Sequence, residues 1–198
     1  MSWFRRTPLE AARWVVIDCE TSGLDAARDE LLSVGAVVVR DGGVELREFF
    51  QAKVRQRIPS SRENILIHGI GGDAQRGGEP LAHVIDALAR FLGDGLPVGF
   101  HALFDAAVLR RHGLRTRTRW LDLATLAPAL FPAKGKADSP LEHWLAAFGI
   151  PARARHDALG DAFATAQLLL VALAEAKRQR VSSVEGLRQA ATSRFLRP

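Results

Sequence analysis

The start of the chain holds three apolar runs rich in β-branched residues. They are Arg13–Asp18, Leu31–Arg40 and Val44–Gln51, with Asp41-Gly42-Gly43 between the last two. Runs of this length and composition are typical of buried strands, and an Asp-Gly-Gly sequence supplies the residues that a tight hairpin turn requires. The chain is therefore predicted to open with an antiparallel meander.

Beyond this meander, helical and extended patterns alternate. Residues 53–78 form a long connection with little periodicity, and connections of this length are often functional. The elements expected after it are a helix at Glu79–Leu92, a strand at Leu96–Phe100, a helix at Ala102–His112 closed by Gly113, a strand near Arg119–Leu121, helical segments at Leu123–Leu130 and Leu141–Phe148, and a long helix from about Asp157 to Arg180. Residues 182–198 are expected either to add a short helix or to lack regular structure.

The order of these elements indicates the fold class. Strands first, followed by alternating helices and strands, are typical of an α/β fold with a mixed five-stranded sheet. A chain of 198 residues is long enough for one hydrophobic core. Because no repeat, low-complexity tract or shift in composition divides the sequence, we expect one domain over residues 1–180 and a tail over residues 181–198.

The net charge and the cysteine content indicate which kind of binding partner and which cellular compartment suit the protein. The net charge of +5 and the isoelectric point near 10.3 favour an anionic partner such as nucleic acid, although proteins from Arg-rich proteomes carry the same excess. Cys19 is the single cysteine, which excludes an internal disulfide and fits a reducing cytoplasm. No apolar run approaches the roughly 18 residues that cross a bilayer, and the N-terminus lacks the apolar segment of a secretory signal. We therefore expect a cytoplasmic protein without a membrane span.

Asp18 and Glu20 lie at the end of the first expected strand. Side chains two apart on a strand point to the same face, so the two carboxylates project together while Cys19 points the other way. Neighbouring carboxylates repel each other unless a cation lies between them, and oxygen ligands select hard ions such as Mg²⁺ or Mn²⁺. Taken alone, this pair fits a solvated strand end equally well.

Two further acids favour a metal site over a solvated strand end. Asp105 lies in the first turn of the helix after the fourth expected strand, and Asp161 lies early in the long C-terminal helix. Aspartate is common in first helical turns because of the helix dipole, so neither residue alone indicates a site. Together with the strand pair, however, they place four carboxylates within reach of one edge of a sheet.

The segments around these acids resemble a known family. VVIDCETSGL (Val15–Leu24), HALFD (His101–Asp105) and HDALGD (His156–Asp161) are similar, in order and spacing, to the three motifs of the DEDD exonuclease superfamily. They match its histidine-bearing branch (DEDDh), which includes the proofreading epsilon subunit of bacterial DNA polymerase III. The similarity covers roughly residues 13–174, the expected core of the domain, and includes an IHGI segment at Ile67–Ile70.

The resemblance implies a ribonuclease H-like fold and a metal-dependent 3′→5′ exonuclease that releases nucleoside 5′-monophosphates. Asp18, Glu20, Asp105 and Asp161 would hold two Mg²⁺ or Mn²⁺ ions. Two such ions, about 3.5–4 Å apart, activate the attacking water and stabilise both the entering and the leaving oxygen. His156 would be the general base, a role that suits the unperturbed histidine pKa of about 6.5.

The resemblance also implies a set of nucleotide contacts. The candidate substrate-binding residues are Thr21, Gly23, Leu24, His68, His101 and Phe104. For the turn at Thr21–Leu24, nucleotide contact is favoured over a purely structural role, whereas for the two histidines and Phe104 both roles stay open. Arg153 and Arg155, just before the histidine motif, are candidate phosphate ligands. Ala102 departs from the family pattern, which commonly has Asn after the histidine, so substrate preference and efficiency are in doubt.

The expected substrate is a single-stranded or frayed 3′ end of DNA. RNA stays open as a substrate, because RNA-trimming members of the family share every catalytic residue. With no polymerase segment in the sequence, proofreading would occur in trans, beside a DNA polymerase or a repair complex. The alternative from a different class is a non-catalytic nucleic-acid-binding scaffold, which is disfavoured because it would need neither four acids nor the histidine.

Overall fold

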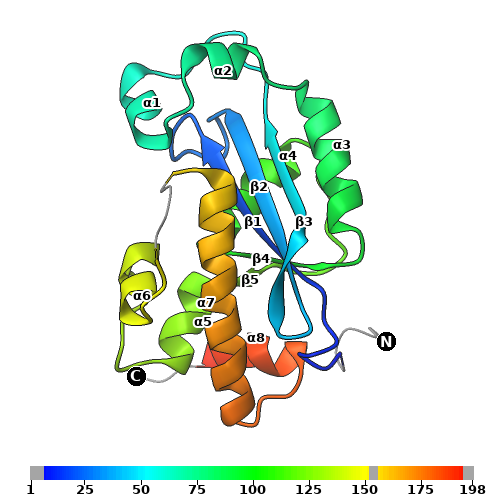
Figure 1. Cartoon of the computed structure of the whole chain (residues 1–198), viewed down its shortest axis with the longest axis vertical. Helices are drawn as coiled ribbons and strands as arrows, with labels where there is room; N and C mark the ends of the chain where they lie inside the picture. Colours follow the sequence, from blue (N-terminus) through cyan, green and yellow to red (C-terminus); the bar gives the residue numbers. More distant parts are fainter. Residues whose placement is uncertain (1–6, 152–155, 194–198) are drawn as a thin grey trace.

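The computed structural model describes residues 7–151 and 156–193. A five-stranded sheet in the order β3-β2-β1-β4-β5 lies at its centre (Figure 1). The strands are β1 (Trp14–Thr21), β2 (Leu31–Arg40), β3 (Gly43–Lys53), β4 (Leu96–Gly99) and β5 (Leu121–Asp122). The first three are antiparallel neighbours, whereas β4 runs parallel to β1 and β5 parallel to β4. This confirms the expected α/β fold with a mixed sheet.

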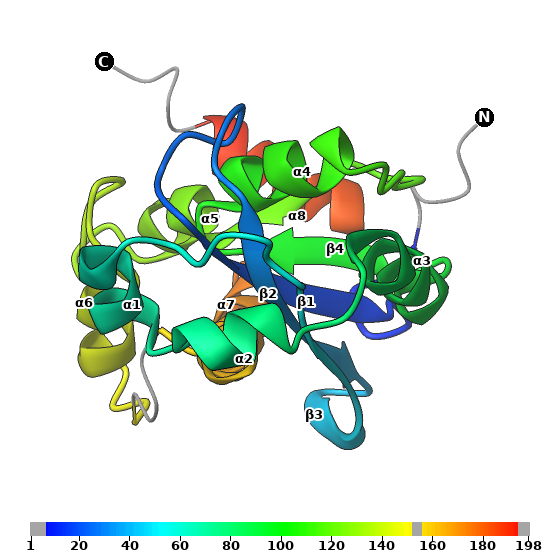
Figure 2. The same ribbon diagram turned by 90° about the horizontal axis from the view of Figure 1, so that it is seen from above.

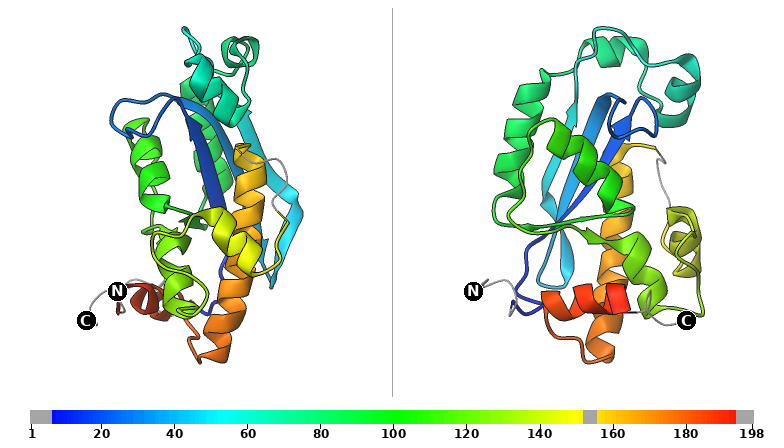
Figure 3. Two further views of the ribbon diagram at one scale, coloured as in Figure 1. Left: turned by 90° about the vertical axis from the view of Figure 1, so that its left-hand side faces the viewer. Right: turned by 180° about the vertical axis from the view of Figure 1, so that it is seen from behind.

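Helices surround this sheet. In the described part of the chain they are α1 (Arg62–His68), α2 (Gly72–Arg76), α3 (Leu81–Leu92), α4 (Ala102–Arg111), α5 (Leu123–Leu130), α6 (Leu141–Ala147), α7 (Ala158–Arg178) and α8 (Val184–Ser193). Figures 2 and 3 show α4 and α7 on opposite faces of the sheet. The long α7 begins at the end of the molecule that also carries α1 and α2 (Figure 1).

The alternation of side chains along β1 explains these two layers. Trp14 and Val16 pack into a core cluster with residues of α5, α6, α7 and α8, whereas Val15 and Ile17 pack into a second cluster with residues of α3 and α4. Successive residues of a strand point to opposite faces, so a strand that is covered on both sides must be apolar throughout. Every residue of β2 from Leu31 to Val39 is buried for the same reason.

The first strand is longer than predicted. It continues past Asp18 to Thr21, because Asp18 pairs with Gly35 and Glu20 with Ser33 in the ladder with β2, and the register shifts only after Glu20. The predicted bound at Asp18 is therefore too short, whereas the prediction that the two acids lie at the strand end is confirmed, because β1 ends directly after Glu20. Both carboxylates belong to a strand that is paired on its β2 side, which fixes their backbone more firmly than a loop would.

The connection over residues 53–78 also differs from the prediction, because it contains the two short helices α1 and α2. Neither exceeds seven residues, so neither carries the repeated apolar spacing that identifies a longer helix. Buried polar side chains hold the segment in place instead. Gln56 donates to the Leu31 carbonyl, and Gln75 donates to the Ser60 hydroxyl and the Ile70 carbonyl.

In the described C-terminal residues, the long helix α7 packs along β1, β2 and β3, and α8 packs against α5. Within residues 182–198, the structure describes α8, whose Val184, Leu187 and Ala191 are buried in the same cluster as α5 and α7. By length and composition alone, α7 would suffice to cross a membrane, so the prediction that no run in the sequence is long and apolar enough to do so is wrong. Half of its most apolar window is buried inside the protein, as in a core helix.

Candidate active site

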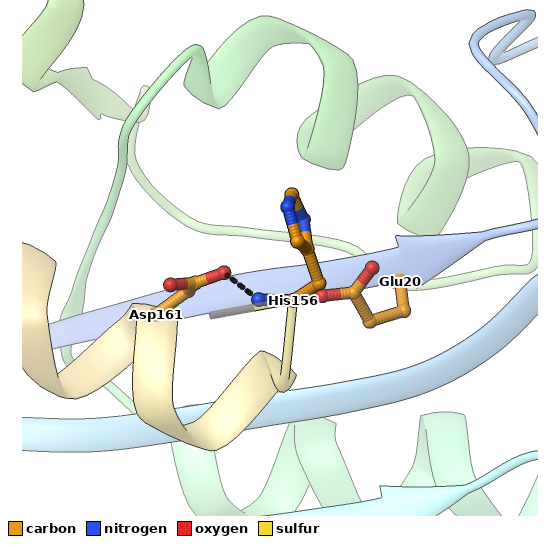
Figure 4. Close-up of side chains that lie close together, drawn as sticks. All are labelled: Glu20, His156 and Asp161. Carbon is orange, nitrogen blue, oxygen red and sulfur yellow. Dashed lines mark hydrogen bonds between the residues drawn. The ribbon is translucent and has the colours of Figure 1, made fainter. Parts of the chain in front are cut away.

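Glu20, His156 and Asp161 come together at the end of the sheet where β1 finishes and α7 begins. One ligand atom from each residue lies within 4.8 Å of the others (Figure 4). The backbone N–H of His156 also donates to Oδ2 of Asp161 over 3.0 Å. This bond ties the residue before α7 to an acid in its first turn, so the three groups form a cluster that could hold a metal ion.

Asp18 and Asp105 extend this cluster into the interior of the protein. Burial raises the pKa of Asp18 well above its usual value, and the nearby carboxylates of Asp105, Glu20 and Asp161 raise it further. Burial likewise raises the pKa of Asp105 to about 8, although hydrogen bonds from Cys19 act in the opposite direction. The four predicted acids thus lie close enough to disfavour one another's charged forms, as carboxylates that share a site do.

Gly35 permits this convergence, and the sequence analysis did not identify it. It lies opposite Asp18 in the β1–β2 ladder, and a Cβ atom there would approach the backbone nitrogen of Leu159 to 2.2 Å. Only a glycine lets the start of α7 approach the sheet so closely, which brings Asp161 near Asp18. A glycine inside an otherwise β-branched strand was the available signal, because it often marks a close backbone approach.

The turn after Glu20 is held by its own hydrogen bonds. The Thr21 hydroxyl donates to the Gly23 carbonyl over 2.6 Å, and Thr21 is buried. The Asp29 carboxylate accepts from the Ser22 hydroxyl and from the Asp25 backbone N–H. These contacts leave Leu24 almost fully exposed at the tip of the turn, where its side chain is free to meet a ligand.

His68 is placed differently from the other predicted contacts. Its Nδ1 accepts from the Ile70 backbone N–H at 2.9 Å, so its Nε2 carries the proton that Asn64 Oδ1 accepts at 2.7 Å. Asn64 in turn donates to the Thr21 carbonyl over 3.1 Å. His68 is therefore buried and occupied by intramolecular bonds, which join α1 to the turn after β1.

Around α4, His101 is exposed and adopts a left-handed conformation (φ 58°) immediately before the helix, with its ring edge-on to Phe100. Phe104 packs partly against the core cluster that contains Ile17. Ala102 is fully buried, so the departure from the family pattern is a small side chain inside the packing.

Two acids near the site serve as helix caps. Asp122 accepts from the Ala124 backbone N–H and is the N-cap of α5. The Asp157 carboxylate caps α7 by accepting from the Gly160 backbone N–H, and it also accepts from the Gln51 side-chain amide. Because Asp157 supplies the cap of α7, the side chain of His156 is not needed for it. Arg153 and Arg155 lie outside the described residues.

The sequence that carries these acids and the histidine matches a known protein family. The family model for RNase T-type proteins, described as "Exonuclease", matches residues 15–169, which contain all four acids and His156. The chain belongs to this exonuclease family. Membership makes it an enzyme of the phosphodiester hydrolase class, in agreement with the resemblance that its motifs carry.

Curated relatives of this exonuclease include replication proteins. It is 32% identical over 170 residues to a DNA polymerase III subunit epsilon-like protein of Rhodobacter capsulatus, covering 83% of the chain and 24% of that protein. It is 28% identical over 198 residues to a PolC-type DNA polymerase III of Thermotoga petrophila, covering 96% of the chain and 14% of that protein. The exonuclease thus spans a quarter or less of the length of these relatives.

Solved structures share the fold of the exonuclease. Escherichia coli exonuclease I in complex with a dT13 oligonucleotide superimposes with a TM-score of 0.71 at 22% identity, over 85% of this chain and 42% of that one. Exonuclease X in complex with 5′-overhanging duplex DNA gives the same TM-score and identity over 90% and 99% of the respective chains. At this level of identity, the likeness supports the ribonuclease H-like fold and not a shared substrate.

Proposed function

We propose that this exonuclease removes nucleoside 5′-monophosphates one at a time from the 3′ end of a DNA strand by two-metal hydrolysis. The convergence of Glu20, His156 and Asp161 within 4.8 Å, beside the buried Asp18 and Asp105, is the observation that carries the proposal. A non-catalytic scaffold would gain nothing from burying carboxylates against one another, because their mutual repulsion lowers the stability of the fold.

The donor set fits a pair of hard divalent cations. Asp18, Glu20, Asp105 and Asp161 offer only carboxylate oxygens, the ligands that Mg²⁺ and Mn²⁺ prefer. Asp105 and Asp161 are 5% and 7% exposed, so bulk water does little to offset their charge and a bound cation is the effective counter-charge. When bound, the two cations would supply Lewis-acid stabilisation of the charge that develops on the scissile phosphate.

His156 is the proposed general base. Its ring lies beside the carboxylates of Glu20 and Asp161, and its backbone is held by the bond from its N–H to Asp161. A histidine there is placed to take the proton of the attacking water, because imidazole accepts a proton near neutral pH. Its left-handed backbone (φ 60°) is uncommon for residues other than glycine and is consistent with a constrained functional position.

The exposed Leu24 and the partly buried Phe104 are the proposed contacts for the terminal nucleotide, with Thr21 and Gly23 shaping the turn that carries Leu24. Thr21 begins the turn directly after Glu20, so a nucleotide placed there would present its phosphate to the acids. DNA is the proposed substrate because exonucleases I and X, which share the fold, form complexes with it. The epsilon-like relative supports a role beside a polymerase or in repair.

The direction of digestion and the chemical identity of the released nucleotide test this proposal. A single-stranded oligonucleotide labelled at its 5′ end should shorten stepwise and release 5′-monophosphates, faster than a fully paired end, because melting a terminal pair costs free energy. The same oligonucleotide with a 3′-terminal phosphate should react more slowly, and a circular single strand should resist. Ready cleavage of the circle would show an endonuclease and contradict the proposal.

A further inference from the structure

The short helix α1 and the residues before it expose an unusual combination of side chains next to the proposed site. Ile58 and Leu66 are 85% and 77% exposed, although both are large and apolar. Arg57, the sequence neighbour of Ile58, and Arg62, the first residue of α1, are also exposed. Arg62 and Leu66 are four residues apart on α1 and therefore lie on one face of that helix. We call these four residues the α1 face.

The two arginines have no ion pair or side-chain hydrogen bond within the described part of the chain, so their charge is available to a ligand. The nearest acid in sequence, Glu63, is engaged elsewhere. Its pKa is lowered by hydrogen bonds from its own backbone N–H and from the Ser61 hydroxyl, which caps the same helix. Glu63 therefore leaves the guanidinium groups of the α1 face without a neutralising partner among the described residues.

The α1 face is joined to the proposed nucleotide pocket through the opposite side of the helix. Asn64 donates to the Thr21 carbonyl over 3.1 Å and accepts from His68. Because Thr21 directly follows Glu20 in β1, this bond places α1 next to the proposed site. Figure 1 shows α1 at the end of the molecule where α7 begins.

From these observations we infer that the α1 face is a second binding site, which holds the single-stranded DNA upstream of the terminal nucleotide. The inference rests on the proposed function. Arg57 and Arg62 would contact phosphates, while Ile58 and Leu66 would pack against unpaired bases. Exposed cations interleaved with apolar side chains suit a single strand, whose phosphates and base faces are both accessible.

The length of the substrate provides the test. Two double variants, Arg57→Ala with Arg62→Ala and Ile58→Ser with Leu66→Ser, are compared with wild type on a DNA dinucleotide and on a single strand of about 12 nucleotides. A dinucleotide has no phosphate upstream of the scissile one and only one upstream base, so it offers Arg57 and Arg62 nothing to contact. The ratio of kcat/KM for the long strand to kcat/KM for the dinucleotide should fall by about 10-fold in each variant.

Salt dependence gives a second readout for the arginine variant. Loss of two phosphate contacts should reduce the magnitude of the slope of log(kcat/KM) for the long strand against log[salt] by about 1.4, since each contact to a single strand contributes about 0.7. The matched controls are Arg90→Ala on α3 and Leu46→Ser on β3, which are exposed residues of the same types outside the α1 face. Both controls should keep the wild-type ratio.

Two results would overturn the inference. One is an unchanged length ratio in the double variants, including the case of an equal loss on both substrates, and the other is a similar fall of the ratio in the controls. Melting temperatures near that of wild type would show that the variants fold. A failure of the proposed function would differ from both of these, because the wild-type protein would then hydrolyse neither substrate.

Discussion

Asp18 has the least favourable environment of the proposed metal ligands. Burial and four neighbouring carboxylates raise its pKa, so its charged form destabilises the metal-free protein. Asp18→Asn keeps the shape and removes the charge. We expect the free energy of unfolding of the metal-free protein at pH 7 to rise by on the order of 1–3 kcal/mol, while turnover with Mg²⁺ falls by more than about 100-fold.

Chemical denaturation in excess chelator measures the stability of this variant, and release of mononucleotides measures its turnover. Asp86→Asn, at an exposed position of α3, is the matched control and should change neither quantity. A large loss of stability in metal-free Asp18→Asn would instead assign Asp18 a structural role.

Substitution of His156 distinguishes an effect on turnover from an effect on substrate binding. His156→Ala removes the proposed base but leaves the four carboxylates in place, so turnover should fall by roughly 10²–10⁴-fold while the affinity for a single-stranded oligonucleotide changes little. The rate of the wild type should depend on pH more strongly than the rate of the variant, which lacks the proposed proton acceptor. Because metal-bound water also titrates near neutral pH, the comparison between the two proteins is needed.

The control for this variant is His83→Ala on α3, an exposed histidine outside the site. If His156→Ala kept more than about a third of wild-type turnover, the loss would be far smaller than a general base contributes and the assignment would fail.

Individual residues show where sequence patterns suffice and where they do not. The cap role of Asp122 could be predicted, because an aspartate before an apolar helix is a common N-cap. The sequence could not decide between substrate contact and a structural role for His68. That choice depends on Asn64 and Ile70, whose contacts with the ring exist only once α1 has folded against β1.

Among the elements, α7 depends most on a single contact with the sheet. Gly35→Ala would place a methyl group against the backbone of Ala158 and Leu159, which cannot rotate away. We expect a loss of stability on the order of 1–3 kcal/mol from this overpacking. Turnover should fall by about 100-fold, because Asp161 and His156 would move away from Asp18 and Glu20.

Thermal denaturation and steady-state turnover test this prediction. Gly43→Ala in β3 is the matched control, because nothing lies within 4 Å of a Cβ atom at that position. If Gly35→Ala retained wild-type turnover, α7 would not need this close contact to position its catalytic groups.

Most elements of the fold could be predicted from periodicity. The bounds of β2 and α5 agree with the structure, because β2 ends where Arg40 and Asp41 break the apolar run and α5 begins directly after its N-cap Asp122. The strand β5 was displaced by one or two residues, and α1 and α2 were missed. Polar side chains such as Gln56 and Gln75 hold that connection, and their partners lie far away in the sequence, so no local pattern reveals them.

For the whole molecule, the buried acids predict how stability varies with pH. The pKa of Asp105 is raised from its usual value of 3.8 to about 8. Between these values the folded protein binds more protons than the unfolded chain, so the free energy of unfolding of the metal-free protein should fall as pH rises. From pH 6.5 to 8 the expected loss is on the order of 1–2 kcal/mol, and it is absent below the unfolded value.

Denaturation curves in excess chelator across this range test the sign of the effect. Asp105→Asn should flatten the dependence, and saturating Mg²⁺ should oppose it, because a cation stabilises the charged carboxylates. His68 changes the free energy of unfolding with pH in the opposite direction. Its lowered pKa costs stability as pH falls below about 6.5, so the comparison is made above that pH.

The most direct test of the account is the dependence of mononucleotide release on divalent metal. The purified chain is incubated with a 5′-labelled single strand in Mg²⁺, in Mn²⁺ and in excess EDTA. We expect stepwise release of 5′-monophosphates with either ion, none in EDTA, and recovery when Mg²⁺ is added back. Undiminished release in excess chelator would contradict this expectation, because Asp18, Glu20, Asp105 and Asp161 would then have no cation to hold during the reaction.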